Sequence, residues 1–124
     1  MRTNPAVWFE IYVQDMERAR RFYESVFDVT LQKLEAGDLE YWSFPSMGPD
    51  RPGCGGALVK MRGVASGGNS VIVYFGCEDC AVEAGRVVEA GGRIHRDKIS
   101  IGQYGFVVLA YDTEGNMIGL HSMR

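Results

Sequence analysis

The sequence predicts an α+β protein built from two tandem βαβββ repeats, whose curved mixed sheets surround a concave pocket. The first observation is that the order strand, helix, three strands occurs twice along the 124 residues. The second is that each predicted helix follows an aspartate, Asp15 or Asp79, which is a preferred N-cap residue. The two aspartates lie 64 residues apart, and an internal repeat of this kind is stronger evidence for a fold than any single element.

The first repeat is predicted over about residues 5–62, beginning with a strand at 6–13. That segment, AVWFEIYV, is rich in β-branched and aromatic residues, as is typical of strands. Side chains alternate along a strand, so Trp8, Glu10 and Tyr12 share one face. The opposite face is entirely apolar, and we expect it to pack under a helix.

A helix is predicted from about Met16 to Val26, because apolar residues recur there at helical spacing. The Gly/Pro-rich residues 46–56 are predicted to be a loop, acting either as a lid or as a plain connection. The remaining strands of this repeat are predicted at residues 29–35, 39–45 and 57–62.

The second repeat is predicted over about residues 70–123, within a single domain that covers residues 1–124. Its helix follows Asp79, carries Val82, Val87 and Val88, and ends near Ala90, where two glycines stop it. Its strands are predicted at residues 70–76, 93–98, 104–111 and 117–122. The open groove and the leftover strand edges favour a homodimer.

Composition and charge exclude several classes of partner. Hydrophobic residues make up 46% and charged residues 23%, which is ordinary for a globular protein. The net charge of -3 with scattered Lys and Arg argues against nucleic acid and against an anionic membrane surface. No apolar run reaches the roughly 18 residues of a membrane span, and no signal peptide is evident. Three cysteines give no disulfide framework, so we expect a cytoplasmic protein.

Two motifs resemble those of a known superfamily. The segment VQDMERARRFYESVF at residues 13–27 and the ending YDTEGNMIGLHS at residues 111–122 are similar to the vicinal oxygen chelate proteins. That superfamily includes glyoxalase I, extradiol dioxygenases and the bleomycin- and fosfomycin-resistance proteins. The resemblance covers nearly the whole chain and implies the glyoxalase-like fold. It implies much less about function, since this scaffold supports many chemistries.

The resemblance also implies where a metal would bind, namely on the inward faces of four strands. Carried over to this chain, those positions hold Trp8, Ile72, Gly119 and a residue near Ala57. None of these side chains offers a carboxylate, imidazole or thiolate donor. We therefore expect no cofactor, and a divalent metal only at a displaced site.

Two positions further along the same faces, three polar side chains are predicted to converge in one cavity. Glu10, Tyr74 and His121 each lie two residues after an empty metal position, with Trp8 as an apolar wall. A carboxylate in an apolar cavity has a raised pKa, so Glu10 and His121 are candidates for a catalytic acid/base pair or for ligands of a displaced metal. The alternative is a buried Glu–His pair that organises the core.

The segment from Lys98 to Tyr104 is predicted to cross the mouth of the groove, where Lys98 and Tyr104 are candidates for binding a polar or anionic ligand group. The alternative is an ordinary solvated connection. A Cys-x-x-C motif at Cys77 and Cys80 has no second cysteine pair for zinc and favours a structural role.

The predicted function is that of a small-molecule-binding protein of the glyoxalase and bleomycin-resistance type with a metal-independent pocket. Its partners would be a small organic molecule and a second copy of the chain. A glyoxalase-related lyase or isomerase that moves a proton on a small carbonyl compound is the alternative, so the sequence leaves open whether the protein is an enzyme. A module without a ligand is the third possibility.

Overall fold

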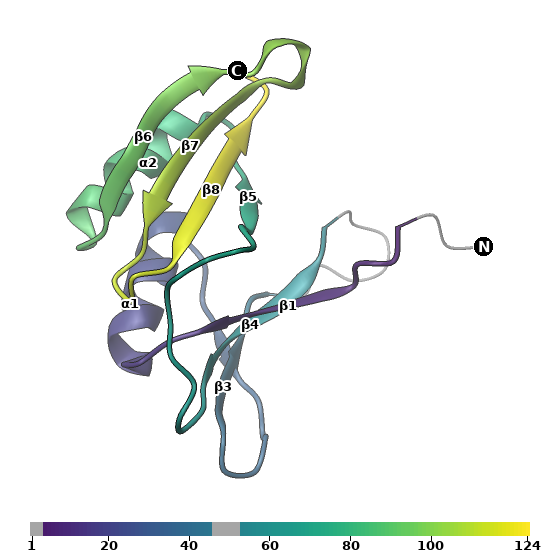
Figure 1. Cartoon of the computed structure of the whole chain (residues 1–124), viewed down its shortest axis with the longest axis vertical. Coiled ribbons are helices and arrows are strands. Elements are labelled where there is room, and N and C mark those ends of the chain that lie inside the picture. The colour runs from purple at the N-terminus through teal and green to yellow at the C-terminus, as the bar shows by residue number, and fades with distance from the viewer. Residues whose placement is uncertain (1–3, 46–52) are drawn as a thin grey trace.

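The computed structural model describes residues 4–45 and 53–124 and contains two four-stranded mixed sheets with two α-helices (Figure 1). The first half comprises β1 (Trp8–Tyr12), α1 (Met16–Phe27), β2 (Gln32–Lys33), β3 (Glu40–Ser43) and β4 (Gly55–Lys60). The second half comprises β5 (Tyr74–Gly76), α2 (Cys80–Glu89), β6 (Arg93–Ser100), the 3-10 turn η1 (Gly102–Tyr104), β7 (Phe106–Tyr111) and β8 (Met117–Ser122). The tandem βαβββ order is confirmed.

The two sheets have the same strand order, β1-β4-β3-β2 and β5-β8-β7-β6. In each sheet the first and last strands of the repeat pair in parallel, and the other pairs are antiparallel. This order leaves β1 and β5 at the sheet edges. The predicted strand at 70–76 shortens to β5, because only its last three residues join the ladder with β8. Residues 46–52 of the predicted loop lie outside the described residues.

Both helices begin at the predicted aspartates. The Asp15 carboxylate accepts a hydrogen bond from the Arg18 amide at 3.0 Å, and the Asp79 carboxylate accepts one from the Ala81 amide at 3.0 Å. α1 ends at Asp28, which adopts a left-handed conformation with φ of 53°. These caps satisfy backbone groups that the helix itself leaves unpaired.

The three valines of α2 are not all buried. Val87 is buried, but Val82 and Val88 are 52% and 58% exposed. The buried positions are Cys80 and Val87, seven residues and therefore about two helical turns apart. A helix of this register turns Val82 and Val88 away from the sheet.

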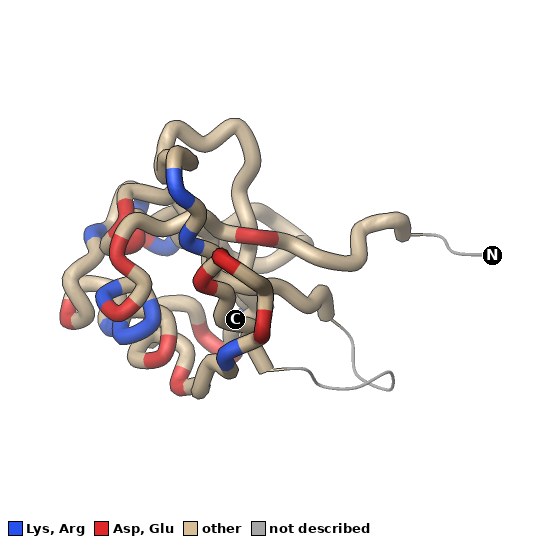
Figure 2. Tube along the Cα trace, turned by 90° about the horizontal axis from the view of Figure 1, so that it is seen from below, with Lys and Arg blue, Asp and Glu red and all other residues tan. Residues whose placement is uncertain are grey.

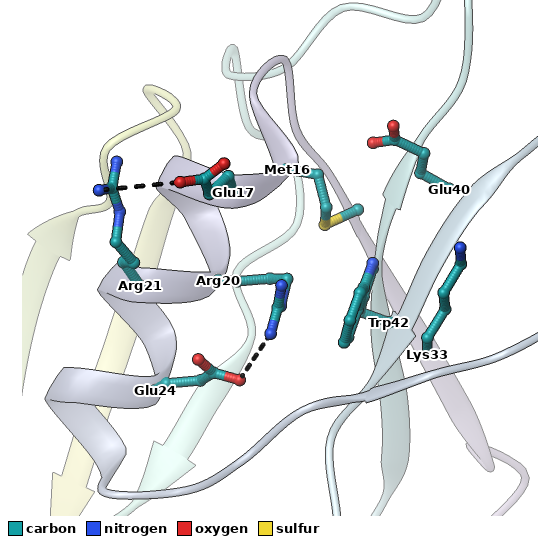
Figure 3. Close-up of a pocket in the computed structure, with 8 residues that line it drawn as sticks. All are labelled: Met16, Glu17, Arg20, Arg21, Glu24, Lys33, Glu40 and Trp42. Atoms are coloured by element: carbon teal, nitrogen blue, oxygen red, sulfur yellow. Dashed lines mark ion pairs between the residues drawn. The ribbon is translucent and has the colours of Figure 1, made fainter.

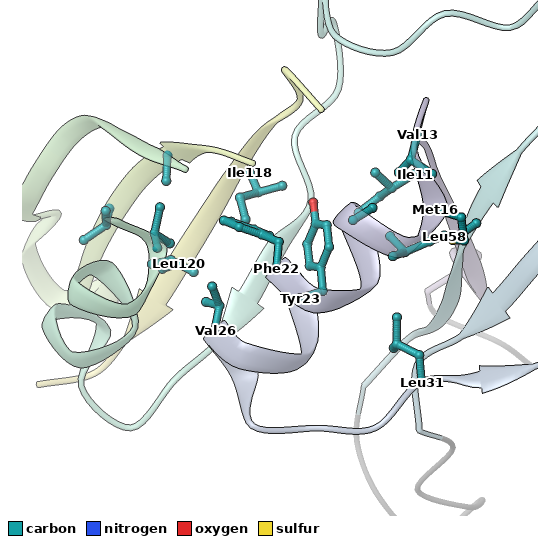
Figure 4. Close-up of a cluster of buried hydrophobic side chains, with 14 of the residues drawn as sticks. Ile11, Val13, Met16, Phe22, Tyr23, Val26, Leu31, Leu58, Ile118 and Leu120 are labelled. Atoms are coloured by element: carbon teal, nitrogen blue, oxygen red, sulfur yellow. The ribbon is translucent and has the colours of Figure 1, made fainter. Parts of the chain in front are cut away.

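One hydrophobic core spans both halves of the chain (Figure 4). α1 supplies five buried residues at the predicted spacing, namely Met16, Ala19, Phe22, Tyr23 and Val26. They pack with buried residues of both sheets, including Leu58 of β4 and Leu120 of β8. α1 therefore lies where the two sheets meet, and it belongs to the core of both repeats.

The turn between β7 and β8 fastens the second repeat to the first. The Glu114 carboxylate accepts hydrogen bonds from the backbone amides of Gln14 and Asp15, both at 2.9 Å, and binds the Arg18 guanidinium. Two residues earlier, the Asp112 carboxylate accepts a 2.6 Å hydrogen bond from the Tyr23 hydroxyl. These contacts fix the position of the β1–α1 junction relative to the second sheet.

Charged residues are more frequent around the helices than on β1. Acidic and basic residues are interspersed around the helices, whereas β1 carries one acidic residue and no basic one (Figure 2). Within the described residues, neither helix, with 12 and 10 residues, has the length to cross a membrane. Glu10 is thus the one charged residue of β1.

Candidate functional site

The face of the first sheet that turns away from α1 carries the three predicted residues of β1. Register pairs Trp8 with Gly55, Glu10 with Ala57 and Tyr12 with Val59, so these six residues share that face. The opposite face, with Ile11 and Val13, is buried against the helix. The predicted alternation of β1 is thus confirmed, and Trp8 is 46% exposed on the open side.

Glu10 lies at the centre of an aromatic cluster that we call the Glu10 cluster, formed by Trp8, Glu10, Tyr12 and Tyr41. Its carboxylate accepts hydrogen bonds from Tyr12 Oη at 2.9 Å, from Trp8 Nε1 at 3.3 Å and from Tyr41 Oη. Tyr41 comes from β3, whose register with β4 places it beside Val59 on the same face. The sequence prediction missed Tyr41, because its place depends on a strand pairing 31 residues away.

The pKa expected for Glu10 is wrong in direction. The hydrogen bond from Tyr41 lowers the pKa of Glu10 most, burial opposes it, and the bonds from Tyr12 and Trp8 add to it, so the pKa lies below 4.5. The physical reason is that Glu10 is exposed and surrounded by donors, rather than enclosed in an apolar cavity. Glu10 is therefore ionised at neutral pH and is a poor general base there.

The open face of the second sheet carries Tyr74 and His121. These two residues line a cavity of about 300 Å³ together with Ile101 and Val107. His121 Nε2 lies 2.6 Å from the backbone carbonyl of Tyr104, and a carbonyl can only accept, so Nε2 carries the proton.

Within one chain the structure does not bring Glu10 together with Tyr74 and His121. Glu10 lines a different cavity, of about 210 Å³, and no hydrogen bond or ion pair joins it to His121. The alternative of a buried Glu–His pair in the core is wrong, since neither residue is buried. Alternation predicted which face each side chain occupies, but it carries no information on the angle between the sheets.

Lys98 and Tyr104, the candidates from the groove mouth, are placed differently from each other. Lys98 Nζ binds the Asp79 carboxylate at 2.9 Å and lies over the Phe106 ring, on the side of the sheet that α2 covers. Tyr104 contacts His121 through its backbone, while its side chain is 66% exposed. Tyr104 therefore borders the open face, and Lys98 does not reach it.

The four positions where the fold would hold a metal do not fit one. Trp8, Ile72, Ala57 and Gly119 have no metal-binding atoms in their side chains. At Gly119 the ring of Tyr74 occupies the space, since a Cβ atom there would lie 2.3 Å from it. No group of three or more His, Cys, Asp or Glu side chains gathers anywhere in residues 4–45 and 53–124.

A further cavity, of about 440 Å³, lies between α1 and strands β2 and β3 on the helix side of the first sheet (Figure 3). Here the Arg20 guanidinium stacks 3.5 Å from the ring centre of Trp42 and pairs with Glu24 at 3.6 Å. Glu17 and Arg21 form a second, exposed pair at 4.0 Å. Acidic and basic residues both line this cavity. Because Arg20 lies on α1 and Trp42 on β3, their contact holds the helix against the strand.

Comparison with known proteins agrees with this architecture. The family model described as Glyoxalase/Bleomycin resistance protein/Dioxygenase superfamily matches residues 6–120. The chain belongs to this superfamily. As a member of it, the chain lacks the standard metal ligands. No curated protein sequence matches it.

Solved structures that resemble this superfamily member share its fold at low sequence identity. The hypothetical protein SA1046 from S. aureus is 16% identical with a TM-score of 0.74, over 97% of this chain and 95% of that one. The antibiotic-binding protein TnmS3 from Streptomyces sp. CB03234 is 20% identical with a TM-score of 0.70, over 98% of each chain. A V278E mutant of glyoxalase I from Zea mays is 23% identical with a TM-score of 0.76, over 98% of this chain. The chain spans 47% of that glyoxalase, about half its length.

Proposed function

We propose that this protein binds a small organic molecule, without a metal, in a pocket completed by a second copy of the chain. The observation that carries the proposal is that each sheet leaves one face open with large aromatic residues on it. Trp8 is 46% exposed on the first sheet, and Tyr74 is 50% exposed on the second. Exposed apolar faces of this kind mark interaction sites.

A homodimer would close these faces. β1 and β5 are edge strands, and an edge presents unpaired backbone groups that a second chain can cover. In a two-fold dimer the Glu10 cluster of one chain would face Tyr74 and His121 of its partner, which would bring together the residues that one chain keeps apart. The antibiotic-binding neighbour supports binding, since its fold is the same. The cysteines among the described residues are free, which fits the cytoplasm.

The alternative of a glyoxalase-related lyase or isomerase has less support. It requires Glu10 as a base and His121 as its partner. Glu10 already accepts three hydrogen bonds and has a lowered pKa, which weakens it as a base. The same two residues fit better as polar groups that orient a ligand within a mainly apolar pocket.

The experiment that tests the proposal begins with a screen of antibiotics and small metabolites by melting temperature. A ligand of the native state must raise it, in proportion to RT ln(1 + [L]/Kd). We expect at least one such ligand and a dimer by light scattering. A monomer in solution, or a screen in which no compound raises the melting temperature, would contradict the proposal and favour a module without a ligand.

Mixing variants then tests whether the pocket is shared between chains. Trp8→Ala and His121→Ala should each lose binding of the screened ligand. When the two are unfolded and refolded together, random pairing should restore binding in about one quarter of the pockets, since each heterodimer has one intact site. As a control, mixing Trp8→Ala with the double variant Trp8→Ala/His121→Ala should restore none. A pocket formed within one chain would show no recovery in either mixture.

A further inference from the structure

Glu10 differs from Glu17 and Glu24, two acidic side chains that line the cavity on the helix side of the first sheet. Glu24 pairs with Arg20, and Glu17 pairs with Arg21. Among the described residues, no Lys, Arg or His lies within ion-pair distance of Glu10. Its three partners are neutral donors, so its negative charge is solvated and oriented without being neutralised.

The donors around Glu10 also leave it acceptor capacity. An ionised carboxylate has about four lone-pair sites. Tyr12 uses Oε1, whereas Trp8 and Tyr41 share Oε2, so one site on Oε1 stays open. A ligand that donates to this oxygen would add a charge-assisted hydrogen bond, the stronger kind. A ligand that carries a negative charge would be repelled.

Among the residues that the structure describes, no Lys, Arg or His lines the space beside Glu10. Glu10 and Tyr12 border the cavity of about 210 Å³ that separates β1 from residues 65–73 and the start of β8. The other residues that line it are apolar, or are amide and hydroxyl residues such as Ser66, Asn69 and Asn116. The oxygens of both asparagines already accept backbone amides, from Met117 and Gly67 respectively. Glu10 is therefore the charged group that a ligand in this space would meet.

The aromatic rings of the cluster favour the same sign of ligand charge. The faces of Trp and Tyr rings attract cations, by about 0.5–2 kcal/mol for each well-placed ring. Trp8, Tyr12 and Tyr41 all contact the Glu10 carboxylate through their polar edges. A cation that binds the carboxylate would therefore lie in the same cluster as these three rings.

We propose that the Glu10 cluster is a subsite for the positively charged group of an organic cation, a protonated amine or a guanidinium joined to an apolar body. This inference rests on the proposed function, since it names the chemical class of the ligand in the same pocket. In the dimer, the apolar body would lie on the second copy of the chain, against the cavity that Tyr74, Ile101 and Val107 line on its second sheet. The Glu10 cluster would thus select a ligand by its charge, and the cavity on the second sheet would select it by its shape.

Three probes that share one ring and differ in charge test the subsite, namely benzylammonium, benzyl alcohol and benzoate. The readout is the indole N–H signals of the two tryptophans by NMR. Trp8 lies in the cluster, while Trp42 lies under Arg20 on the helix side and serves as an internal control. We expect benzylammonium to shift the Trp8 signal with a Kd about tenfold lower than that of benzyl alcohol, and benzoate to bind least.

Two matched variants separate charge from packing. Glu10→Gln should remove the preference for benzylammonium over benzyl alcohol, and Glu40→Gln, at an acid on the other side of the sheet, should keep it. A third variant, Tyr41→Phe, removes one hydrogen bond of the cluster but keeps the ring and the charge of Glu10, so it should retain most of the preference. It shows whether a disturbed cluster, rather than the lost charge, explains the result with Glu10→Gln. Equal binding of the cation and the alcohol, or a preference that survives Glu10→Gln, overturns the cation subsite and leaves the binding function standing. If no probe shifts Trp8, the subsite is also overturned, and the screen and mixing experiment judge the proposed function separately.

Discussion

The carboxylate of Glu114 lies against the guanidinium of Arg18, 96 residues earlier, with two N···O distances of 2.7 and 3.0 Å. The Glu114 side chain is fully buried, while Arg18 covers it from the solvent side and is 47% exposed. Glu114 also accepts two backbone amides at the start of α1. This pair is therefore the main polar connection between the last turn of the second repeat and the first helix.

Glu114→Gln should lower the free energy of unfolding by about 1–3 kcal/mol, because a buried amide would face donors that need an acceptor. Urea denaturation followed by circular dichroism measures the change. Glu17→Gln is the control, since Glu17 is exposed and its pair with Arg21 spans 4.0 Å, so we expect a change below about 0.5 kcal/mol. Equal effects of the two substitutions would contradict the role assigned to Glu114.

The contribution of Glu114 should depend on pH. Burial acts to raise its pKa, but the hydrogen bonds from Arg18, Asp15 and Gln14 outweigh burial and lower the pKa from 4.5 to about 2. Because the folded pKa lies below the unfolded one, the stabilisation is fully present above pH 4.5 and is lost as the pH falls toward 2. The difference in stability between the wild type and Glu114→Gln should shrink over that range.

Asp112 acts in the opposite direction, since burial raises its pKa above 3.8 despite the hydrogen bonds from Tyr23, Asn116 and Glu114. Asp112 is present in both the wild type and Glu114→Gln, so its effect largely cancels in the difference in stability between them. Denaturation curves at a series of pH values measure that difference. A difference that stays constant from neutral pH to below pH 4.5 would show that Glu114 has no lowered pKa.

Two glycines with equally close neighbours should respond differently to alanine. A Cβ atom at Gly92 would lie 2.4 Å from the Tyr111 carbonyl oxygen and 2.7 Å from the buried Phe22 ring, neither of which can move freely. Gly92→Ala should therefore cost about 1–3 kcal/mol of stability. At Gly119 the neighbour is the ring of Tyr74, which is half exposed and can rotate away.

Gly119→Ala should accordingly cost less than about 1 kcal/mol, while it moves Tyr74 out of the proposed pocket. Thermal denaturation measures the stability of both variants, and ligand titration measures the pocket. A large loss of stability in Gly119→Ala would mean that Tyr74 is held rigidly in its place over the glycine.

The cysteines of the Cys-x-x-C motif should react slowly. Burial raises the pKa of Cys77 to about 12, with a further contribution from Glu83, and Cys80 is fully buried. The thiolate is the reactive form, so alkylation of the native protein near neutral pH should label Cys54, which is exposed. Mass spectrometry should find one labelled site before unfolding and all three after it. Rapid labelling of Cys77 would reopen a redox role for the motif.

The elements of the fold could be predicted because their signals are local. Asp15 and Asp79 each cap a helix by binding an amide two or three residues later, and β1 follows strict alternation. The site was harder to predict because it depends on pairings between strands that are distant in the sequence. Tyr41 reaches Glu10 only through the register of β3 on β4. The face of the sheet on which Lys98 lies could not be predicted, because β6 has register shifts between Ile94 and Arg96 and again before Ile99. These shifts break the alternation of side chains.

The turn between β7 and β8, residues 112–116, also bears on the order in which contacts form during synthesis. The amides of Gln14 and Asp15 bind a carboxylate that lies 100 and 99 residues later in the chain. Arg18 and Tyr23, on the first helix, leave the ribosome long before Glu114 and Asp112 are synthesised. The contacts that join this helix to the second repeat therefore form only after residues 112–114 have been made, although the helix also packs on the first sheet. Each repeat has its own sheet, but the polar contacts between the repeats depend on the last turn of the second one.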